Sequence, residues 1–250
     1  GIETTKAAHQ WIHKNNMMDR IITISNHSKN VFEMSKYEAV NNETGETFAL
    51  QHETPISVVN YPVRTYDNLP ELELELSTGF NFLILLHGDM SDQEIHALYC
   101  HPKLNAILSL PHGEGFGLPL FEAAYSGMPV IATGWSGQLD YLIDESGKER
   151  FYNVNYDIQP VQQEAVWEGV IMAESMWAYA REPSAKKNMR QCYNDILNNE
   201  GHAADAINFA EELKQRFSAE NMYAQFCDAI YAPTKEETQW EQELSSVELV

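Results

Sequence analysis

Two glutamates flank a short glycine-rich stretch near the middle of the chain. Within the segment PHGEGFGLPLFEAAYSGMP, Glu114 precedes Glu122 by eight positions. Because the two oxygens of a carboxylate accept hydrogen bonds from neighbouring hydroxyls, each glutamate could hold a sugar ring or a ribose. The glycines that would let the backbone approach such a ligand closely are Gly113, Gly115 and Gly117. These residue types predict a ligand that carries both hydroxyls and phosphate, since the acids would repel phosphate alone.

The glycine-rich stretch lies where an apolar strand over 105–111 leads into a helix over 118–127. Ligands of open α/β sheets bind outside the carboxyl ends of the strands. A helix amino end offers unpaired N–H groups and a positive partial charge to phosphate. Glu114 would then lie in the loop and Glu122 about one turn inside the helix, so both could face one pocket.

The spacing alone leaves a second interpretation open. The glycines could simply shape a tight turn, with both glutamates in solvent. The pattern is not G-x-G-x-x-G, because its glycine order differs, and it is not a P-loop, because no Lys-Ser/Thr pair follows.

The elements around this loop follow an alternating pattern. A continuous apolar run over 80–88 predicts a strand buried on both faces, and the next helix starts with Ser91 and Glu94 as a capping box. A further strand is expected over 129–133. Strand, helix, strand, helix, strand over residues 80–133 predicts an α/β fold, a Rossmann-like doubly wound parallel sheet with right-handed crossovers.

The flanking segments predict further elements. Before the sheet we expect a helix over 3–18, a strand over 20–25, a helix capped by Asn26 or Ser28, a turn or hairpin over 41–50, a strand over 55–63 and an edge strand or extended linker over 68–77. After it we expect helices over 162–180, 184–199, 201–217 and 218–231, the last capped by Ser218. Helical spacing assigns Trp167, Met172, Met176 and Trp177 to the core.

Composition limits the class of protein. The formal net charge of −21 disfavours nucleic acid and anionic lipid as partners, because no basic patch reverses the field. No run approaches the roughly 18 apolar residues of a membrane helix, so no integral membrane segment is expected. The cysteines, three in number, have no metal-ligand or disulfide spacing, which favours a reducing, cytoplasmic location.

The segment HGEGFGLPLFEAAYSGMPVIAT closely resembles the nucleotide-sugar signature of retaining glycosyltransferases with the two-Rossmann-domain (GT-B) architecture, the glycosyl transferases group 1 class. The family's E-x7-E motif maps onto Glu114 and Glu122. The resemblance implies that Glu114, with the backbone of Gly115, Phe116 and Gly117, contacts the donor sugar and its phosphates. It implies that Glu122 holds the ribose of the nucleotide.

The resemblance extends to neighbouring residues. His112 could form a hydrogen bond with a hydroxyl of the sugar donor, or serve a structural role. Gly113 and Leu118 belong to the same donor-binding motif. The turn LLHGDMS looks like the family's base-contacting turn, around Gly88 and Met90. The segment GWSGQLDYL, which follows the third strand, could line the same cleft through Gly134, Ser136 and Gly137.

The resemblance also implies a division of the chain into segments. The expected segments are the end of an amino-terminal, acceptor-side α/β domain (1–66), a linker (67–79), the nucleotide-sugar-binding Rossmann-like domain (80–160), carboxy-terminal helices (161–232) and an acidic, disordered tail (233–250). The chain would therefore hold only a remnant of the second α/β domain. The family's glycine-arginine/lysine loop has no counterpart near 80–90, where an internal segment of the family pattern is missing.

The function implied is transfer of a sugar from a nucleotide-diphosphate sugar to an unknown glycan, lipid or protein acceptor, with retention of configuration. No metal ion or other cofactor is expected, since the helix amino end and basic side chains replace a metal in this architecture. One alternative is a non-catalytic nucleotide-sugar-binding module or a truncated, inactive fragment of such an enzyme. Another is a related phosphorylase or epimerase, and the lack of a motif-placed lysine for a pyridoxal cofactor counts against a phosphorylase.

Overall fold

The computed structural model describes residues 2–41, 43–74 and 88–233. The strand expected over 80–88 and the tail expected over 233–250 fall almost entirely outside these residues. The position near residues 80–88, where the family resemblance predicts a missing internal segment, also falls almost entirely outside them.

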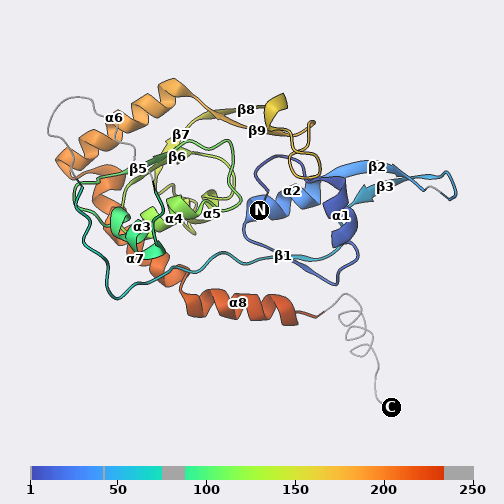
Figure 1. Ribbon diagram of the computed structural model, residues 1–250, viewed down its shortest axis with the longest axis horizontal. Coiled ribbons are helices and arrows are strands. Elements are labelled where there is room, and N and C mark those ends of the chain that lie inside the picture. The colour runs from blue at the N-terminus through green and yellow to red at the C-terminus, as the bar shows by residue number, and fades with distance from the viewer. Residues whose placement is uncertain (1, 42, 75–87, 234–250) are drawn as a thin grey trace, which may run out of the picture.

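The amino-terminal part contains two short helices and two small sheets. Its elements are α1 (His9–Asn15), β1 (Ile21–Thr23), α2 (Asn26–Met34), β2 (Lys36–Val40), β3 (Thr47–Gln51) and β4 (Ile56–Val58). Strands β1 and β4 pair in parallel, whereas β2 and β3 form the expected hairpin, which projects from the molecule in Figure 1. The cap of α2 is Ser25 rather than Asn26 or Ser28: its hydroxyl accepts from the Ser28 N–H at 3.2 Å.

The central sheet consists of three parallel strands. The elements in chain order are α3 (Asp92–Tyr99), β5 (Ile107–Ser109), α4 (Leu118–Tyr125), β6 (Val130–Thr133), α5 (Leu139–Leu142) and β7 (Tyr152–Val154). The strand order is β5-β6-β7, and all four residues of β6 are buried. The capping box of Ser91 and Glu94 is confirmed, because both of its hydrogen bonds are present. The described part of the chain is thus a mixed α/β fold with parallel sheets.

The helix expected over 162–180 is wrong. Strands β8 (Tyr156–Pro160) and β9 (Met176–Ala180) form an antiparallel hairpin, with the single 3-10 turn η1 (Gln163–Ala165) in the connection. The apolar residues of this segment fit a helical period over a short window. Gly169, at φ +78°, is incompatible with a continuous helix. Pairing with β8 makes residues 176–180 a strand, and this long-range contact leaves no local pattern in the sequence. The prediction that Trp167, Met172, Met176 and Trp177 belong to the core is also wrong for most of the set. Trp167 is 67% exposed, and Trp177 is the one of the four that is well buried.

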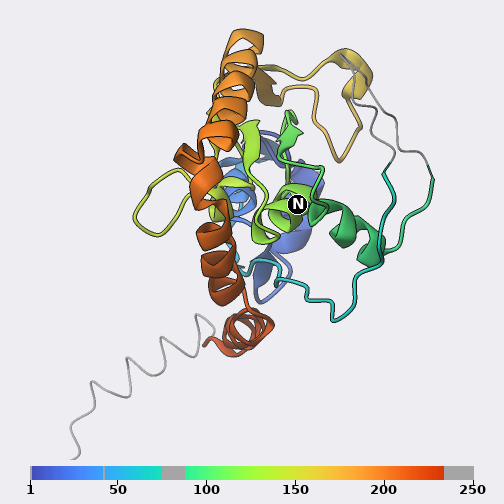
Figure 2. The same cartoon turned by 90° about the vertical axis from the view of Figure 1, so that its left-hand side faces the viewer.

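Three helices complete the chain: α6 (Glu182–Asn198), α7 (Gly201–Arg216) and α8 (Ala219–Tyr231). The carboxy-terminal helices therefore begin at Glu182 and not at residue 161. In Figure 2, α6 and α7 run end to end along one side of the sheet, and α8 turns away at the bottom. The Ser218 cap is confirmed by its hydrogen bond from the Asn221 N–H. The main core joins α4 and α7 through Leu120, Phe121, Tyr125, Phe209 and Leu213.

The amino-terminal part is tied to the central sheet and its hairpin. The Asp140 carboxylate on α5 accepts from the Asn26 N–H at 2.8 Å and from the Asn60 amide at 3.1 Å. The Thr5 N–H donates to the Met176 carbonyl at 2.9 Å. These contacts hold the amino-terminal segment over the loop that precedes α4, which is where the candidate site lies.

Candidate functional site

The glycine-rich loop connects β5 to α4. Helix α4 begins at Leu118, and Gly117 precedes it at φ +85°, a conformation that L side chains rarely adopt. The Tyr141 hydroxyl donates to the Gly117 carbonyl at 2.8 Å. A Cβ on Gly117 would lie 3.0 Å from that hydroxyl, so a larger residue would be strained and crowded. Glycine is therefore required here to turn the chain into the helix.

A second turn, after β6, fixes the backbone of the loop. The Ser136 hydroxyl accepts from the Glu114 N–H at 2.8 Å and donates to the Gln138 side chain at 2.8 Å. The Gly137 N–H donates to the Glu114 carbonyl at 3.0 Å. The Gln138 amide in turn donates to the Thr133 carbonyl at 3.0 Å, at the end of β6. The backbone of Glu114 is thus held on both sides by this turn. That Gly134, Ser136 and Gly137 line the donor cleft stays a prediction.

The Glu114 side chain is half-buried beside the amino-terminal segment. Burial raises the pKa of its carboxyl, and the nearby Glu3 carboxylate raises it further. The carbonyl of Glu3 also lies against Gly113, where an added Cβ would come within 2.1 Å of it. The amino-terminal segment therefore covers one side of the loop and adds a negative charge to it.

The Glu122 side chain has different neighbours. Burial raises the pKa of its carboxyl, with Arg64 opposing this effect and Asp92 adding to it. Arg64 forms an ion pair with Asp92 at 2.9 Å. Glu122 therefore has a cation, Arg64, among its charged neighbours, whereas the charged neighbour of Glu114 is another carboxylate, that of Glu3. That both glutamates reach one pocket stays a prediction.

The turn that holds Gly88 and Met90 leads directly into α3. Gly88 has a φ of +141°, and Asp92 is the first residue of the helix. Asp92 lies close enough to Glu122 to raise the pKa of its carboxyl. The expected base-contacting role of the turn stays a prediction.

The two rings of the loop face inward. The Phe116 ring is 2% exposed and packs against Phe121 and Tyr141, so a ligand would contact the backbone of this residue. The His112 ring lies 4.7 Å from the ring of Trp177, nearly parallel to it, and its Nδ1 lies 2.7 Å from the Ala178 carbonyl. Of the two interpretations of His112, this geometry favours the structural one. Leu118, in contrast, is partly exposed.

Several residues around the loop had no signal in the sequence. Arg64 and Glu3 are distant from the loop along the chain and come close to the two glutamates only through tertiary structure. Tyr141 lies within the segment GWSGQLDYL, but nothing in the sequence pattern predicts its hydrogen bond to Gly117. Gln138 lay within a segment that the resemblance drew attention to, but its buried position beneath Ser136 depends on the fold. The family resemblance places the cations of a diphosphate site near residues 80–90, whereas Arg64 precedes that region in the chain.

The described residues also bear on two other kinds of site, for a metal ion and for a membrane. No cluster of three or more His, Cys, Asp or Glu residues with a geometry for a metal ion occurs among them. None of the helices in residues 2–41, 43–74 and 88–233 is long and apolar enough to cross a membrane.

The family model described as "Glycosyl transferases group 1" matches residues 71–182. The matched segment contains the glycine-rich loop, both glutamates, the three-stranded parallel sheet and the β8–β9 hairpin. No curated protein matches the chain. The match supports a glycosyltransferase of the GT-B class, and the parallel sheets and helices are consistent with a GT-B-like Rossmann fold.

Proposed function

We propose that this protein transfers a sugar from a nucleotide-diphosphate sugar to an acceptor hydroxyl with retention of configuration. The observation that carries the proposal is the loop before α4, in which Ser136 and Gly137 hydrogen-bond the backbone of Glu114 and Tyr141 hydrogen-bonds that of Gly117. The loop lies within the segment that matches the glycosyl transferases group 1 family.

The donor is proposed to lie along the loop and the start of α4. Glu114 accepts hydrogen bonds from hydroxyls of the sugar, and Glu122 accepts from the ribose. The phosphates face the backbone N–H groups of Gly115, Phe116 and Gly117, at the positive end of the helix dipole. The base extends toward Gly88 and Met90, in the turn that leads into α3.

The proposed step breaks the bond between the sugar and the diphosphate, and the electron pair leaves with the phosphate oxygen. The acceptor oxygen bonds to the same face of the sugar, and its proton goes to the departing phosphate. The α4 amino end and the Arg64 guanidinium offset the charge that builds on the leaving group. The proposal includes no metal ion or other cofactor.

A non-catalytic nucleotide-sugar-binding module is the second candidate. It is favoured by the charge around Glu114, where Glu3 adds a second carboxylate. Arg64, which lies near Glu122, is already paired with Asp92. A diphosphate would then meet a partly compensated site, which permits binding while leaving the charge of a departing group weakly stabilised.

Calorimetric titration with a panel of UDP-, GDP- and ADP-sugars, followed by donor hydrolysis assays, separates the two candidates. The transferase predicts saturable binding of one donor and its slow hydrolysis in the absence of acceptor. Binding of a donor without turnover, with or without a panel of acceptors, would support the module. If no member of the panel binds, the site assignment itself is wrong.

A further inference from the structure

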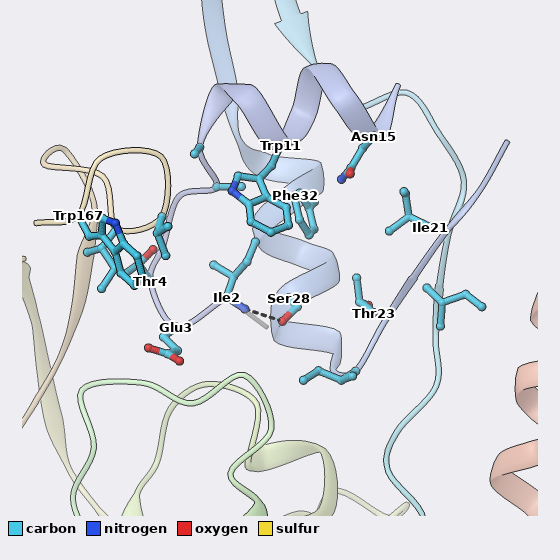
Figure 3. Close-up of a pocket in the computed structure, with 16 residues that line it drawn as sticks. Ile2, Glu3, Thr4, Trp11, Asn15, Ile21, Thr23, Ser28, Phe32 and Trp167 are labelled. Atoms are coloured by element: carbon cyan, nitrogen blue, oxygen red, sulfur yellow. Dashed lines mark hydrogen bonds between the residues drawn. The ribbon is translucent and has the colours of Figure 1, made fainter. Parts of the chain in front are cut away.

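A cavity of about 380 Å³ is lined in part by Glu3, whose carbonyl lies against Gly113 of the glycine-rich loop. It is enclosed by the amino-terminal segment, α1, β1, α2 and the turn over 167–171 (Figure 3). Protein interiors leave few voids larger than a water molecule, whereas small-molecule sites measure about 300–1,000 Å³. The volume of this cavity falls in the range of ligand sites.

The lining of the cavity is largely apolar and aromatic. It includes Ile2, Trp11, Ile21, Phe32, Trp167 and Val170. Trp11 and Trp167 are more than half exposed, although each is an aromatic side chain that a folded protein normally buries. In Figure 3 the Trp11 ring lies next to Phe32, and the Trp167 ring lies at the left, near Thr4. Exposed aromatic side chains at the edge of an apolar cavity are typical of a site for a planar apolar ligand.

One buried polar group in the cavity lacks a partner. Asn15 is 6% exposed, and its amide nitrogen makes no hydrogen bond to any residue that the structure describes. Its side chain hangs from α1 toward the cavity (Figure 3). An unpaired buried donor is costly, so an acceptor atom on a ligand would remove that cost. Hydroxyl groups on the wall of the cavity, in contrast, already form hydrogen bonds. The Ser28 hydroxyl accepts from the Ile2 N–H at 3.1 Å, and the Thr23 hydroxyl donates to the Ser25 carbonyl at 3.3 Å.

The wall formed by the β8–β9 connection is pre-formed. The Trp11 indole N–H donates to the Gly169 carbonyl at 2.8 Å. The Lys6 ammonium forms an ion pair with Glu174 at 3.3 Å, and the Met176 N–H donates to the Thr5 hydroxyl at 3.0 Å. A ligand therefore need not order this segment when it binds.

We propose that this cavity binds a small, uncharged molecule with a planar apolar body and one hydrogen-bond acceptor, which receives the free N–H of Asn15. An uncharged ligand is indicated because Glu3 is the only ionisable one among the lining residues that the structure describes, and its carboxylate lies near that of Glu114 in the glycine-rich loop. The inference does not rest on the proposed function, since neither Glu114 nor Glu122 lines the cavity.

Equilibrium dialysis of the full chain with 7-methoxy-4-methylcoumarin tests the inference directly. This probe is planar, uncharged and carries a carbonyl acceptor, and 2-methoxynaphthalene serves as its counterpart without the carbonyl. We expect saturable 1:1 binding of the coumarin. Trp167→Ala should weaken binding of both probes about tenfold, because one aromatic wall is lost. Tyr193→Ala, which removes an equally exposed aromatic side chain from α6, should leave it unchanged.

Asn15→Leu separates the acceptor contact from the apolar contacts. We expect it to weaken coumarin binding about threefold to tenfold and to leave naphthalene binding unchanged or tighter. Equal weakening of both probes would contradict the Asn15 contact. Absence of coumarin binding to the wild type, or unchanged binding in Trp167→Ala, would overturn the site. Because Trp167 is exposed, its variant keeps the test decisive even if Asn15→Leu fails to fold.

Discussion

At the residue scale, burial shifts two ionisable groups toward their neutral forms where the amino-terminal segment meets the glycine-rich loop. Burial raises the pKa of the Glu114 carboxyl and lowers the pKa of His27 to about 4. The His27 ring lies 4.9 Å from the Trp135 ring, and an added Cβ on Gly113 would lie 2.8 Å from that same ring. The contact between the two parts of the chain is therefore sensitive to pH.

The first prediction concerns His27. Because its pKa is lower in the folded protein than the ordinary value of 6.5, the unfolded chain binds more protons between pH 6.5 and 4. The free energy of unfolding should therefore fall as the pH is lowered through this range, by about 1–3 kcal/mol from this residue. Urea unfolding at several pH values measures this loss, and His27→Gln should flatten it.

The matched control is His13→Gln, which replaces an exposed histidine on α1. It should keep the pH dependence of the wild type. If His27→Gln and the wild type lose the same free energy between pH 6.5 and 4, burial of His27 does not govern this response.

The sequence predicts the two glutamates of the loop but not their neighbours. Glu114, Glu122 and the glycines belong to one continuous stretch, so residue type and spacing are enough to single them out. Arg64 and Glu3 reach the site only because the segment after β4 packs with α4 through Val63 and the amino-terminal segment lies against the loop at Gly113. A charge distant along the chain carries no local pattern that would assign it to a site.

At the element scale, the loop before α4 depends on the turn and short helix that follow β6. Tyr141, on α5, is fully buried, and its hydroxyl donates to the Gly117 carbonyl at 2.8 Å. Tyr141→Phe removes this hydrogen bond while keeping the ring that packs on Phe116 and Phe121. We expect the free energy of unfolding to fall by about 0.5–1.5 kcal/mol in denaturant unfolding experiments.

Tyr179→Phe is the comparison for this variant. The Tyr179 hydroxyl also donates to a backbone carbonyl, that of Pro160 at 3.2 Å, but at an exposed position. Its loss should change the free energy of unfolding by less than about 0.5 kcal/mol. Equal effects of the two variants would show that Tyr141 does not support the loop.

The same scale shows where sequence patterns succeed and where they fail. The capping signals at Ser91 and Ser218 are local, and both are confirmed. Apolar residues recur at helical spacing across 162–180, which predicts a helix where the structure has the β8–β9 connection and β9. The pairing partner that makes β9 a strand lies about 20 residues earlier in the chain, as in the Asp157–Tyr179 pair, and a short periodic window cannot detect it.

At the scale of the whole molecule, Arg150 joins the end of the central sheet to α7. Its side chain is 6% exposed and pairs with Asp144 at 3.2 Å, Asp205 at 2.8 Å and Glu212 at 2.7 Å. Its guanidinium also lies 4.6 Å from the centre of the Phe209 ring. In a chain with a net charge of −21, this cation offsets the repulsion among three neighbouring carboxylates.

Arg150→Met should therefore lower the free energy of unfolding by about 3 kcal/mol, because it leaves the carboxylates unpaired around a buried position. Arg181→Met is the control, since Arg181 forms its ion pair with Asp157 at an exposed position and should cost less than about 1 kcal/mol. Thermal and denaturant unfolding measure both variants. Comparable losses would contradict a structural role for the Arg150 network.

The proposed function places the two glutamates at opposite ends of one donor, and that claim is tested most directly by calorimetry with paired ligands. The donor identified in the panel and its free nucleoside diphosphate are titrated into the wild type, Glu114→Gln, Glu122→Gln and the exposed control Glu220→Gln. We predict that Glu122→Gln weakens both ligands about tenfold or more, whereas Glu114→Gln weakens only the nucleotide-sugar, because only that ligand carries the sugar. Wild-type affinity of both glutamate variants for both ligands would contradict the account.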